Sequence, residues 1–216
     1  MTLRVDNLTI RRFNSEPALC DHVCFTIEPG KVLTLMGPSG CGKSTLLASL
    51  AGHIAPDFQV TGSAQLSQTE LLKLPPHQRQ VGILFQNDCL FPHLNIWENL
   101  AFALPNPIKG KMRKQHALQA LSELDLIALA EHFPEQISGG QRARISLMRM
   151  LLAKPKLALL DEPFSQLDSK LRTQFRDWVF SQLKAAHIPA LLVTHDAQDA
   201  PIGQTVMHWP MENQHA

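Results

Sequence analysis

The segment Gly37-Pro-Ser-Gly-Cys-Gly-Lys-Ser44 decides the fold of this chain. It matches the phosphate-loop pattern G-x-x-x-x-G-K-[ST], in which glycine accepts the backbone shapes that turn successive N–H groups inward around phosphate oxygens. Lys43 is placed to reach the β- and γ-phosphates of a triphosphate, and the Ser44 hydroxyl is placed to bind Mg²⁺. We therefore expect phosphate contacts from Gly37, Pro38, Ser39, Gly40, Cys41, Gly42, Lys43, Ser44 and Thr45.

The residues on either side of this loop predict a strand before it and a helix after it. Residues 31–36 form a short apolar run suited to a buried strand, and residues 44–50 have helical spacing. A helix that begins near Lys43 would direct the positive end of its dipole at the phosphates. The alternative is a glycine-rich turn that binds nothing, and the strand–loop–helix context favours phosphate binding.

Two later apolar runs also end in polar residues. Residues 157–160 precede Asp161 and Glu162, and residues 190–194 precede His195. Because parallel sheets bind ligands beyond the carboxyl ends of their strands, Asp161 is expected to face the Mg²⁺ ion. Glu162 could orient or deprotonate the attacking water, and His195 could donate a hydrogen bond to a γ-phosphate oxygen. Acids at a strand end can also serve only to leave the core, but the phosphate loop favours the catalytic interpretation.

A second helix start with anion-binding character lies at Ser138-Gly139-Gly140-Gln141. Ser138 suits the N-cap position. The two glycines weaken the first helical turn, but they leave its N–H groups unobstructed at the positive end of the helix dipole. The alternative is a flexible helix start. One chain thus carries two phosphate-binding helix starts and catalytic groups for one nucleotide, and a simple resolution is two copies that complete each other's sites.

The apolar patterns along the chain predict an α/β fold with a mainly parallel sheet. In the first thirty residues, apolar positions predict strands on both sides of a turn at Asp6-Asn7. Short apolar runs suited to buried strands follow at residues 31–36, 81–85, 157–160 and 190–194.

The segments between these strands predict helices and loops. Residues 87–154 have helical spacing and form an insertion between two core strands, and another helix is expected from about Lys170 to Ala186. Residues 56–80 are polar and interrupted by proline and glycine. The basic stretch from Lys109 to Lys114 is expected to be a solvated loop.

Length and charge narrow the class of protein. The 216 residues fit one domain, and 20 Lys and Arg residues against 19 Asp and Glu residues give a formal net charge of +1. This balance lacks the basic footprint of a nucleic-acid-binding protein, so no nucleic-acid partner is expected. No run reaches the about 20 apolar residues of a membrane-spanning helix, and the N-terminus has no signal-peptide core, so a cytosolic chain is expected. The four cysteines form no CxxC pair and are expected to be free thiols.

The full set of motifs resembles the ATP-binding cassette (ABC) ATPase family. Six elements occur in the family's order over roughly residues 3 to 200. They are the phosphate loop at 37–44, the Q-loop residue Gln86, the signature Ser138–Gln141, the Walker B strand with its glutamate at Leu157–Glu162, the D-loop Ser165–Asp168 and the switch histidine His195.

This resemblance implies a fold and a working assembly. The fold is a P-loop NTPase core at residues 1–86 and 155–216, with a mainly parallel sheet and N-terminal antiparallel strands, and a helical subdomain at residues 87–154 that carries the signature. Two cassettes would close head to tail around two MgATP, so that the signature of one contacts the γ-phosphate held by the other.

The resemblance also implies individual roles. Glu162 would be the catalytic base, Gln86 would contact Mg²⁺ and water, and Asp168 would help to join the two sites. Lys43 and His195 would complete the catalytic set. The adenine usually stacks on an aromatic residue from the N-terminal region, and Phe13 is the nearest match in a chain that contains no tyrosine.

Residues 91–100, just after Gln86, resemble bacterial importer cassettes, where this segment borders the groove that receives a short helix of the membrane subunit. The alternative is that Phe91, Leu94 and Trp97 are subdomain core. The resemblance implies a peripheral ATPase on the cytoplasmic face of the inner membrane. Its partners would be permease subunits, a second identical ATPase subunit and an extracytoplasmic solute-binding protein.

Two other classes remain as alternatives. A soluble ABC ATPase that acts on DNA or ribosomes usually has a long coiled-coil insertion or two fused cassettes, and this sequence has neither. A regulator that binds ATP without turnover is disfavoured by the intact Lys43, Asp161, Glu162 and His195.

Several positions depart from the family's pattern. Ile137 stands where leucine is usual before the signature, Ala143 where glutamine is frequent, and Gln166 where alanine is common in the D-loop. None of these changes removes a group that the chemistry requires. The larger departure is residues 200–209, which match the family's usual continuation poorly and leave no regulatory C-terminal domain.

Overall fold

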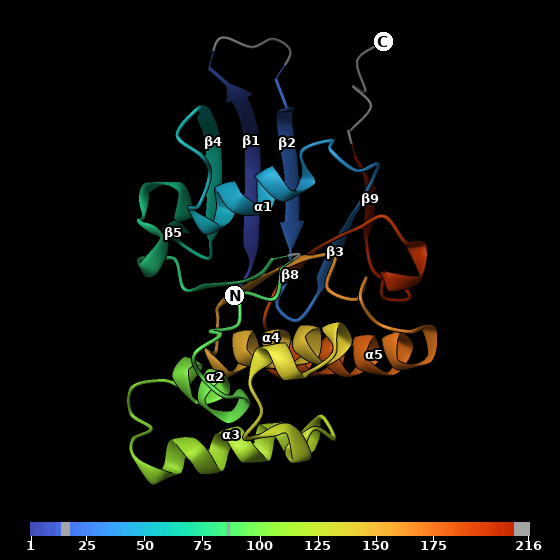
Figure 1. Cartoon of the computed structure of the whole chain (residues 1–216). Helices are drawn as coiled ribbons and strands as arrows, with labels where there is room; N and C mark the ends of the chain where they lie inside the picture. Colours follow the sequence, from blue (N-terminus) through green and yellow to red (C-terminus); the bar gives the residue numbers. More distant parts are fainter. Residues whose placement is uncertain (14–17, 86, 210–216) are drawn as a thin grey trace.

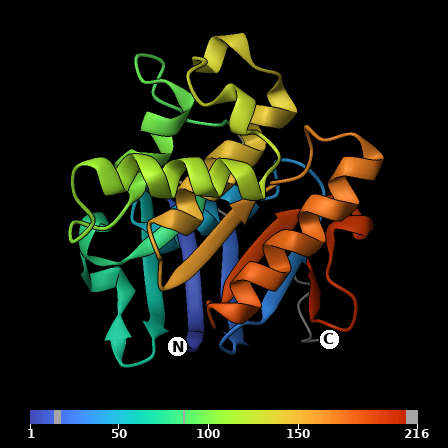
Figure 2. The same cartoon turned by 90° about the horizontal axis from the view of Figure 1, so that it is seen from below.

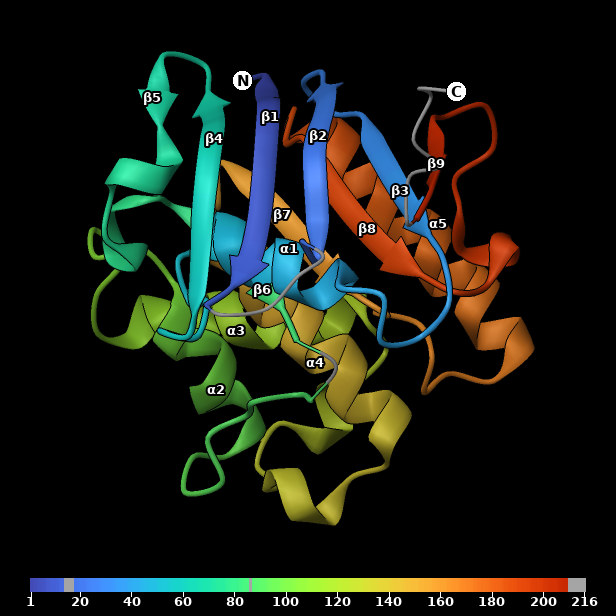
Figure 3. The ribbon, with the colours of Figure 1, turned by 90° about the horizontal axis from the view of Figure 1, so that it is seen from above.

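The core of the structure is a five-stranded sheet in which all strands run parallel. The computed structural model describes residues 1–13, 18–85 and 87–209, so the expected Q-loop residue Gln86 lies outside the described residues. The strand order is β6-β7-β8-β3-β9, and Figure 3 shows β7, β8 and β3 side by side. The five strands span Val32–Met36 (β3), Val81–Leu84 (β6), Leu157–Asp161 (β7), Ala190–Thr194 (β8) and Val206–His208 (β9). The predicted parallel sheet is confirmed.

A second sheet of antiparallel strands has the order β2-β1-β4-β5. Its strands are Leu3–Arg12 (β1), Cys20–Ile27 (β2), Phe58–Leu66 (β4) and Thr69–Glu70 (β5). The predicted turn at Asp6-Asn7 is wrong, because β1 continues through it with a shift of register between Val5 and Leu8. Asn7 has φ of +48°, a conformation that asparagine tolerates better than most residues, so the pair forms an irregularity within one strand.

The composition of residues 56–80 did not predict strand β4. This strand pairs with β1 along its whole length, from Leu66 opposite Leu3 to Phe58 opposite Arg12. Gly62, which suggested a break, has φ of +97°, and a side chain there would collide with the Asn7 carbonyl. The glycine therefore accommodates the irregularity of β1 within the sheet.

Alternate residues of the parallel strands enter two different hydrophobic cores, as strand geometry requires. Leu157 and Leu159 share a core with helix α1 (Lys43–Ala51) and with the antiparallel sheet. Ala158 and Leu160 share a core with helix α5 (Ser169–Ala185) and the helices that follow β6. Figure 1 shows α4 and α5 on the side of the molecule away from α1, and Figure 2 shows α5 crossing beneath the sheet.

Among the described residues between β6 and β7 there are three α-helices and two short 3-10 helices, which confirms the helical character expected there. The α-helices are α2 (Ile96–Ala103), α3 (Lys111–Glu123) and α4 (Gly139–Leu152). Within the described ranges, no helix is long and apolar enough to cross a membrane.

The basic stretch from Lys109 to Lys114 is not the solvated loop that was expected, since α3 begins at Lys111. Arg113 donates hydrogen bonds of 2.6 to 3.0 Å to carbonyl oxygens at the end of α2 and in the following loop, those of Ala101, Leu104 and Ile108. Helix ends leave such carbonyls without intrahelical partners. A run of positive charge in the sequence gives no indication of this role.

The C-terminal segment adds a strand although its sequence departs from the family's usual continuation. Strand β9 pairs with β3, from Thr34 opposite Val206 to Met36 opposite His208. It therefore runs beside the strand that leads into the phosphate loop, as Figure 3 shows.

Candidate nucleotide-binding site

The phosphate loop joins β3 to α1 and contains two left-handed positions. The φ angle is +79° at Gly40 and +95° at Gly42, which is the N-cap of α1. A side chain on Gly42 would also collide with Leu19, because its Cβ would lie 2.7 Å from Leu19 Cγ. Glycine meets both requirements without strain, so the loop glycines have a geometric reason to be there.

Lys43 is the first residue of α1 and is only 5% exposed. Its Nζ donates hydrogen bonds to the carbonyl oxygens of Gly37 at 2.8 Å and Pro38 at 2.7 Å. The ammonium group is thus held by neutral oxygens of its own loop. Lys43 also lines the cavity beside the loop, so its charge lies next to the space where a phosphate would bind.

A cavity of about 380 Å³ lies beside the loop, within the size range of ligand pockets. Most of its lining was predicted from the sequence: Ser39, Gly40, Gly42, Lys43, Ser44, Thr45, Asp161 and Glu162. Leu19, Phe58 and Val193 complete the lining. Phe58 was not predicted because it lies on the unpredicted strand β4, and the apolar Leu19 carries no motif that distinguishes it from a core residue.

Several predicted contacts do not line this cavity in the described structure. Gly37, Pro38 and Cys41 belong to the loop but are absent from the lining. Phe13 is also absent from it, and this residue is 56% exposed. The backbone N–H of Phe13 donates to Asp57 O at 2.9 Å, which places Phe13 beside the Phe58 end of β4. Adenine stacking on Phe13 stays a prediction.

The oxygen groups at the base of the cavity suit a magnesium ion. Burial raises the pKa of Asp161, with the nearby Glu162 adding to the rise, while the Ser44 hydroxyl and Lys43 oppose it. A bound divalent cation would offset this cost of a buried carboxylate. Mg²⁺ prefers one or two carboxylates together with hydroxyl, water and phosphate oxygens, and Asp161 with Ser44 fits that set. Among the described residues no cluster of three or more His, Cys, Asp or Glu side chains could hold a metal alone.

Glu162 and His195 meet at the ends of neighbouring strands. Glu162 follows β7 and His195 follows β8, and His195 Nδ1 lies 2.9 Å from Glu162 Oε1. Glu162 also has φ of +46°, an uncommon conformation for a non-glycine residue. Its backbone N–H donates to Val193 O at 2.9 Å, which ties this strained position to β8. The structure thus brings the two predicted catalytic side chains together.

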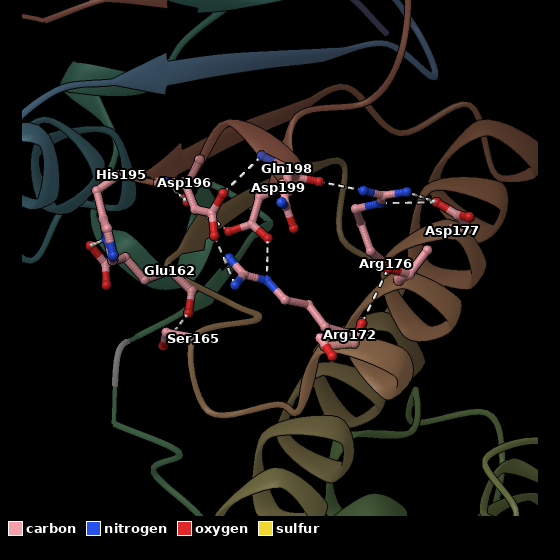
Figure 4. Close-up of polar contacts among 12 residues, drawn as sticks. Glu162, Ser165, Arg172, Arg176, Asp177, His195, Asp196, Gln198 and Asp199 are labelled. Atoms are coloured by element: carbon pink, nitrogen blue, oxygen red, sulfur yellow. Dashed lines mark hydrogen bonds and ion pairs between the residues drawn. The ribbon is translucent and has the colours of Figure 1, made fainter.

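Arg172 on α5 anchors the segment that carries His195. Its Nε lies 2.7 Å from Asp199 Oδ1, and its Nη1 lies 2.9 Å from Asp196 Oδ2 (Figure 4). The Asp199 side chain is almost fully buried and also accepts a hydrogen bond from Thr194 Oγ1 at 2.7 Å. The hydrogen-bonded ion pair with Asp199 raises the pKa of Arg172 above its ordinary value. Arg172 was not predicted from the sequence, because a helix-surface arginine looks the same whether or not it has buried partners.

The signature element forms the start of α4 away from the cavity. Ser138 is the N-cap, and its side chain accepts from the Gln141 N–H at 3.2 Å while Gln141 Oε1 accepts from the Ser138 N–H at 2.8 Å. The predicted cap is confirmed. A side chain on Gly140 would lie 3.2 Å from Leu167 Cδ2, so this helix start rests against the D-loop. None of residues 138–141 lines the cavity of the same chain.

Asp168, the last residue of the D-loop, is the N-cap of α5. Its carboxylate accepts from the Leu171 N–H at 3.0 Å. Its main structural role in one chain is therefore to begin the helix that carries Arg172.

The segment after residue 86 is attached to the signature helix. Arg142 Nε forms an ion pair of 2.8 Å with Asp88 Oδ2, and Ser146 Oγ donates to Asp88 O at 2.7 Å. One turn later, Arg149 donates to Cys89 O at 2.7 Å. Three side chains of α4 thus hold this segment. A displacement of α4 would therefore also displace the segment that follows residue 86.

A partly exposed group of aromatic side chains follows this attached segment, and we refer to the half-buried Phe91 and the exposed His93 and Phe102 as the aromatic platform. The rings of Phe91 and Phe102 meet edge to face with centroids 4.8 Å apart, and Phe102 is 65% exposed. Arg149 lies 5.2 Å above the Phe91 ring. Beneath them the fully buried Asn99 donates to the carbonyl oxygens of Phe91, Leu94 and Asn95.

The fold and the site together define a class. A phosphate loop that opens a helix after a parallel strand, with acidic residues at the end of a neighbouring strand, is the arrangement of a P-loop nucleoside triphosphatase. The family model described as "ABC transporter" matches residues 20–165, more than half of the chain, and the chain belongs to that family.

Comparisons with known proteins agree over nearly the whole chain. An uncharacterized ABC transporter ATP-binding protein of Escherichia coli K12, YnjD, is 46% identical over 95% of this chain and 94% of its own length. The sulfate/thiosulfate import ATP-binding protein CysA of Bordetella pertussis is 39% identical over 93% of this chain and 56% of its own length. A solved dimeric, post-hydrolysis state of the ATP-binding cassette MJ0796 bound to ADP and Pi has a TM-score of 0.82 at 28% identity, covering 95% of this chain and 93% of that one. The chain is an ATP-binding and ATP-hydrolysing subunit of the ABC transporter family.

Proposed function

We propose that this chain is the ATPase subunit of a solute importer, in which two copies close around two MgATP and so drive transport. The observation that carries the proposal is the separation of two phosphate-binding helix starts within one chain. The start of α1 lines the cavity, whereas the start of α4 at Ser138 lies outside it. A second copy can bring its own Ser138 element to this cavity, and the similar MJ0796 cassette is dimeric.

Nucleotide binding in this proposal uses the loop and the metal-suited oxygens. The N–H groups of residues 40–45 and the Lys43 ammonium bind the phosphates, with the helix dipole of α1 adding to the attraction. Ser44 and Asp161, with Gln86 as the sequence predicts, would hold Mg²⁺, which would neutralise charge on the phosphate oxygens. The adenine lies toward Phe58, the first residue of β4, or toward Phe13, which directly follows β1.

Hydrolysis requires a base beside the γ-phosphate. Glu162 lines the cavity next to Asp161, so it is placed to accept the proton of an attacking water. The 2.9 Å contact with His195 fixes the direction of this carboxylate, and His195 in turn can donate to the phosphate. Asp168, at the D-loop beside the signature, serves the joint between two copies.

Closure of the two ATPase copies must be transmitted to a membrane partner to drive transport. The aromatic platform offers a partly exposed apolar surface to a short helix of a permease subunit, and Phe102, at 65% exposed, contributes most of its free apolar area. Because Arg142, Ser146 and Arg149 attach the platform segment to α4, movement of the signature helix would move the docking surface. The relative CysA is named as an import protein, which supports import as the direction of transport.

Purification from native membranes tests this assignment. A tagged chain, extracted in detergent, is expected to bring down a permease and an extracytoplasmic solute-binding protein. The Phe102→Glu variant should lose the permease, whereas Ile202→Glu should keep it, since Ile202 is 98% exposed in the C-terminal segment. Recovery of ribosomes or nucleic acid in place of membrane proteins would contradict the proposal and favour a soluble ABC ATPase.

A further inference from the structure

Trp209 lies against the phosphate loop although it is distant in the sequence. Its indole Nε1 donates a hydrogen bond to the Cys41 carbonyl oxygen at 2.7 Å. Its backbone N–H donates to Met36 O at 2.6 Å. Trp209 is only 3% exposed. One residue therefore holds both the residue before the loop and a residue in the middle of it.

The backbone of Trp209 also packs on the first residue of the loop. A Cβ on Gly37 would clash with the Trp209 carbonyl oxygen, so only glycine permits this approach. The Cys41 Sγ lies 4.0 Å from the same carbonyl oxygen. Gly37, Cys41 and Trp209 are all absent from the cavity lining, so Trp209 contacts the outer side of the loop.

The hydrogen bond to Cys41 constrains the next peptide group. In a trans peptide the C=O of one residue and the N–H of the following residue point in opposite directions. With the Cys41 carbonyl held by Trp209, the Gly42 N–H points away from Trp209. Gly42 lines the cavity and has no Cβ atom to restrict its backbone angles. Without the hydrogen bond from Trp209, the Cys41–Gly42 peptide would therefore rotate easily.

We propose that Trp209 is a positioning residue that sets the phosphate loop for nucleotide phosphates before they bind. Its contribution is to restrict the Cys41–Gly42 peptide to the orientation that offers its N–H to the cavity, which lowers the entropic cost of binding. The inference rests on the proposed placement of the phosphates at this loop. It predicts that loss of the indole N–H weakens the binding of phosphate-bearing ligands and leaves adenosine binding unchanged.

The direct test compares Trp209→Phe with the matched variant Trp178→Phe, whose indole stacks on Phe175 away from the loop. Trp209→Phe should raise the Kd of MgADP about 3- to 10-fold, the loss expected from one hydrogen bond, and keep a melting temperature close to that of Trp178→Phe. Trp178→Phe should bind MgADP like the parent chain. A Trp209→Phe variant that binds MgADP like the parent would overturn the inference, whatever its melting temperature.

A second measurement does not depend on how Trp209→Phe folds. The chain has three tryptophans, so in ¹⁵N-tryptophan-labelled protein carrying Trp97→Phe and Trp178→Phe the remaining indole signal belongs to Trp209. Its indole N–H should exchange slowly with solvent deuterium in the nucleotide-free chain, because the proposal has the hydrogen bond to the Cys41 carbonyl formed before nucleotide binds. An indole N–H that exchanges in the nucleotide-free chain as fast as that of free tryptophan would overturn the role of Trp209 alone. A parent chain that binds no MgADP would overturn both this inference and the proposed nucleotide site.

Discussion

At the residue scale, the carboxylate proposed to act in hydrolysis occupies a strained backbone position. Glu162 has φ of +46° and is held there by its N–H bond to Val193 O and its side-chain contact with His195. Residues in sparsely populated conformations are concentrated at functional sites, where the surrounding structure compensates for the strain. The site therefore stores a small destabilisation where the chemistry is proposed to occur.

Two substitutions separate this strain from the side-chain contact. Glu162→Gly and Glu162→Ala both remove the contact with His195, but only glycine accepts a positive φ without a Cβ clash. The free energy of unfolding of Glu162→Gly should exceed that of Glu162→Ala by about 1 kcal/mol. Urea denaturation measures the difference. An alanine variant more stable than the glycine variant by about 0.5 to 1 kcal/mol, the ordinary entropic advantage of alanine, would show that the backbone at this position is unstrained.

The cysteines differ in reactivity at the same scale. Burial raises the pKa of the Cys20 thiol to about 11, whereas Cys24 is exposed. Because the thiolate is the reactive form, iodoacetamide at about pH 8 should label Cys24 well before Cys20. Peptide mass spectrometry follows both sites in one sample, and labelling in denaturant provides the control in which the two rates converge. Similar rates in the folded chain would contradict the assigned burial.

At the element scale, the segment after β8 depends on one arginine from α5. Arg172 bridges Asp196 and the buried Asp199, and its neighbour Arg176 contacts the exposed Asp177 and the Gln198 carbonyl (Figure 4). Asp199 also bonds to the last residue of β8, so the ion pair fixes the direction in which the chain leaves the sheet. This direction places His195 against Glu162.

Removal of Arg172 should therefore destabilise the fold more than removal of Arg176. Arg172→Met leaves the Asp199 carboxylate buried with Thr194 as its remaining partner, and the free energy of unfolding should fall by about 3 kcal/mol. Arg176→Met frees only the solvent-exposed carboxylate of Asp177, which water can solvate, so it should cost about 1 kcal/mol. The double variant Arg172→Met with Asp199→Asn should recover part of the loss, because the unpaired charge is gone. Equal costs for the two arginines in urea denaturation would refute the anchoring role.

The sequence predicted those elements whose apolar residues are consecutive. The four short runs that became β3, β6, β7 and β8 were recognisable because a parallel strand is buried on both faces. Strand β4 was not recognisable, since one of its faces is exposed. Gly62 also interrupts its apolar pattern, because a side chain at this position would collide with β1. Arg113 and Arg172 gave no signal, because their partners are carbonyls and carboxylates that only the fold brings near.

At the scale of the whole molecule, the proposed function implies that one chain holds an incomplete site. The phosphate loop, Asp161, Glu162 and His195 come together because parallel strands end at one edge of the sheet, and the sequence predicted this much. It also indicated that Ser138 would serve a second copy, and Ser138 does lie outside the cavity of its own chain. The contact of Trp209 with the outer side of the phosphate loop could not be predicted, because the segment that contains Trp209 matches no motif.

The separation of the two helix starts predicts two distinct kinds of defect. Ser138→Arg should bind MgATP within about twofold of the parent, because Ser138 does not line the cavity of its own chain. It should nevertheless hydrolyse almost no ATP, since closure against a second copy would be blocked. Lys43→Ala should lose MgATP binding itself. Calorimetric titration and an ATPase assay distinguish these outcomes, and loss of MgATP binding by Ser138→Arg would place the signature within its own chain's site.

The most direct measurement is the assembly state of the Glu162→Gln variant in MgATP. This substitution removes the proposed base while keeping the shape of the site, so bound MgATP should persist and hold two copies together. Sedimentation velocity should show a dimer that forms with MgATP and dissociates in its absence, and ATP turnover should nearly stop. A Glu162→Gln chain that stays monomeric in saturating MgATP, or that hydrolyses ATP like the parent, would contradict hydrolysis by Glu162 in a closed dimer.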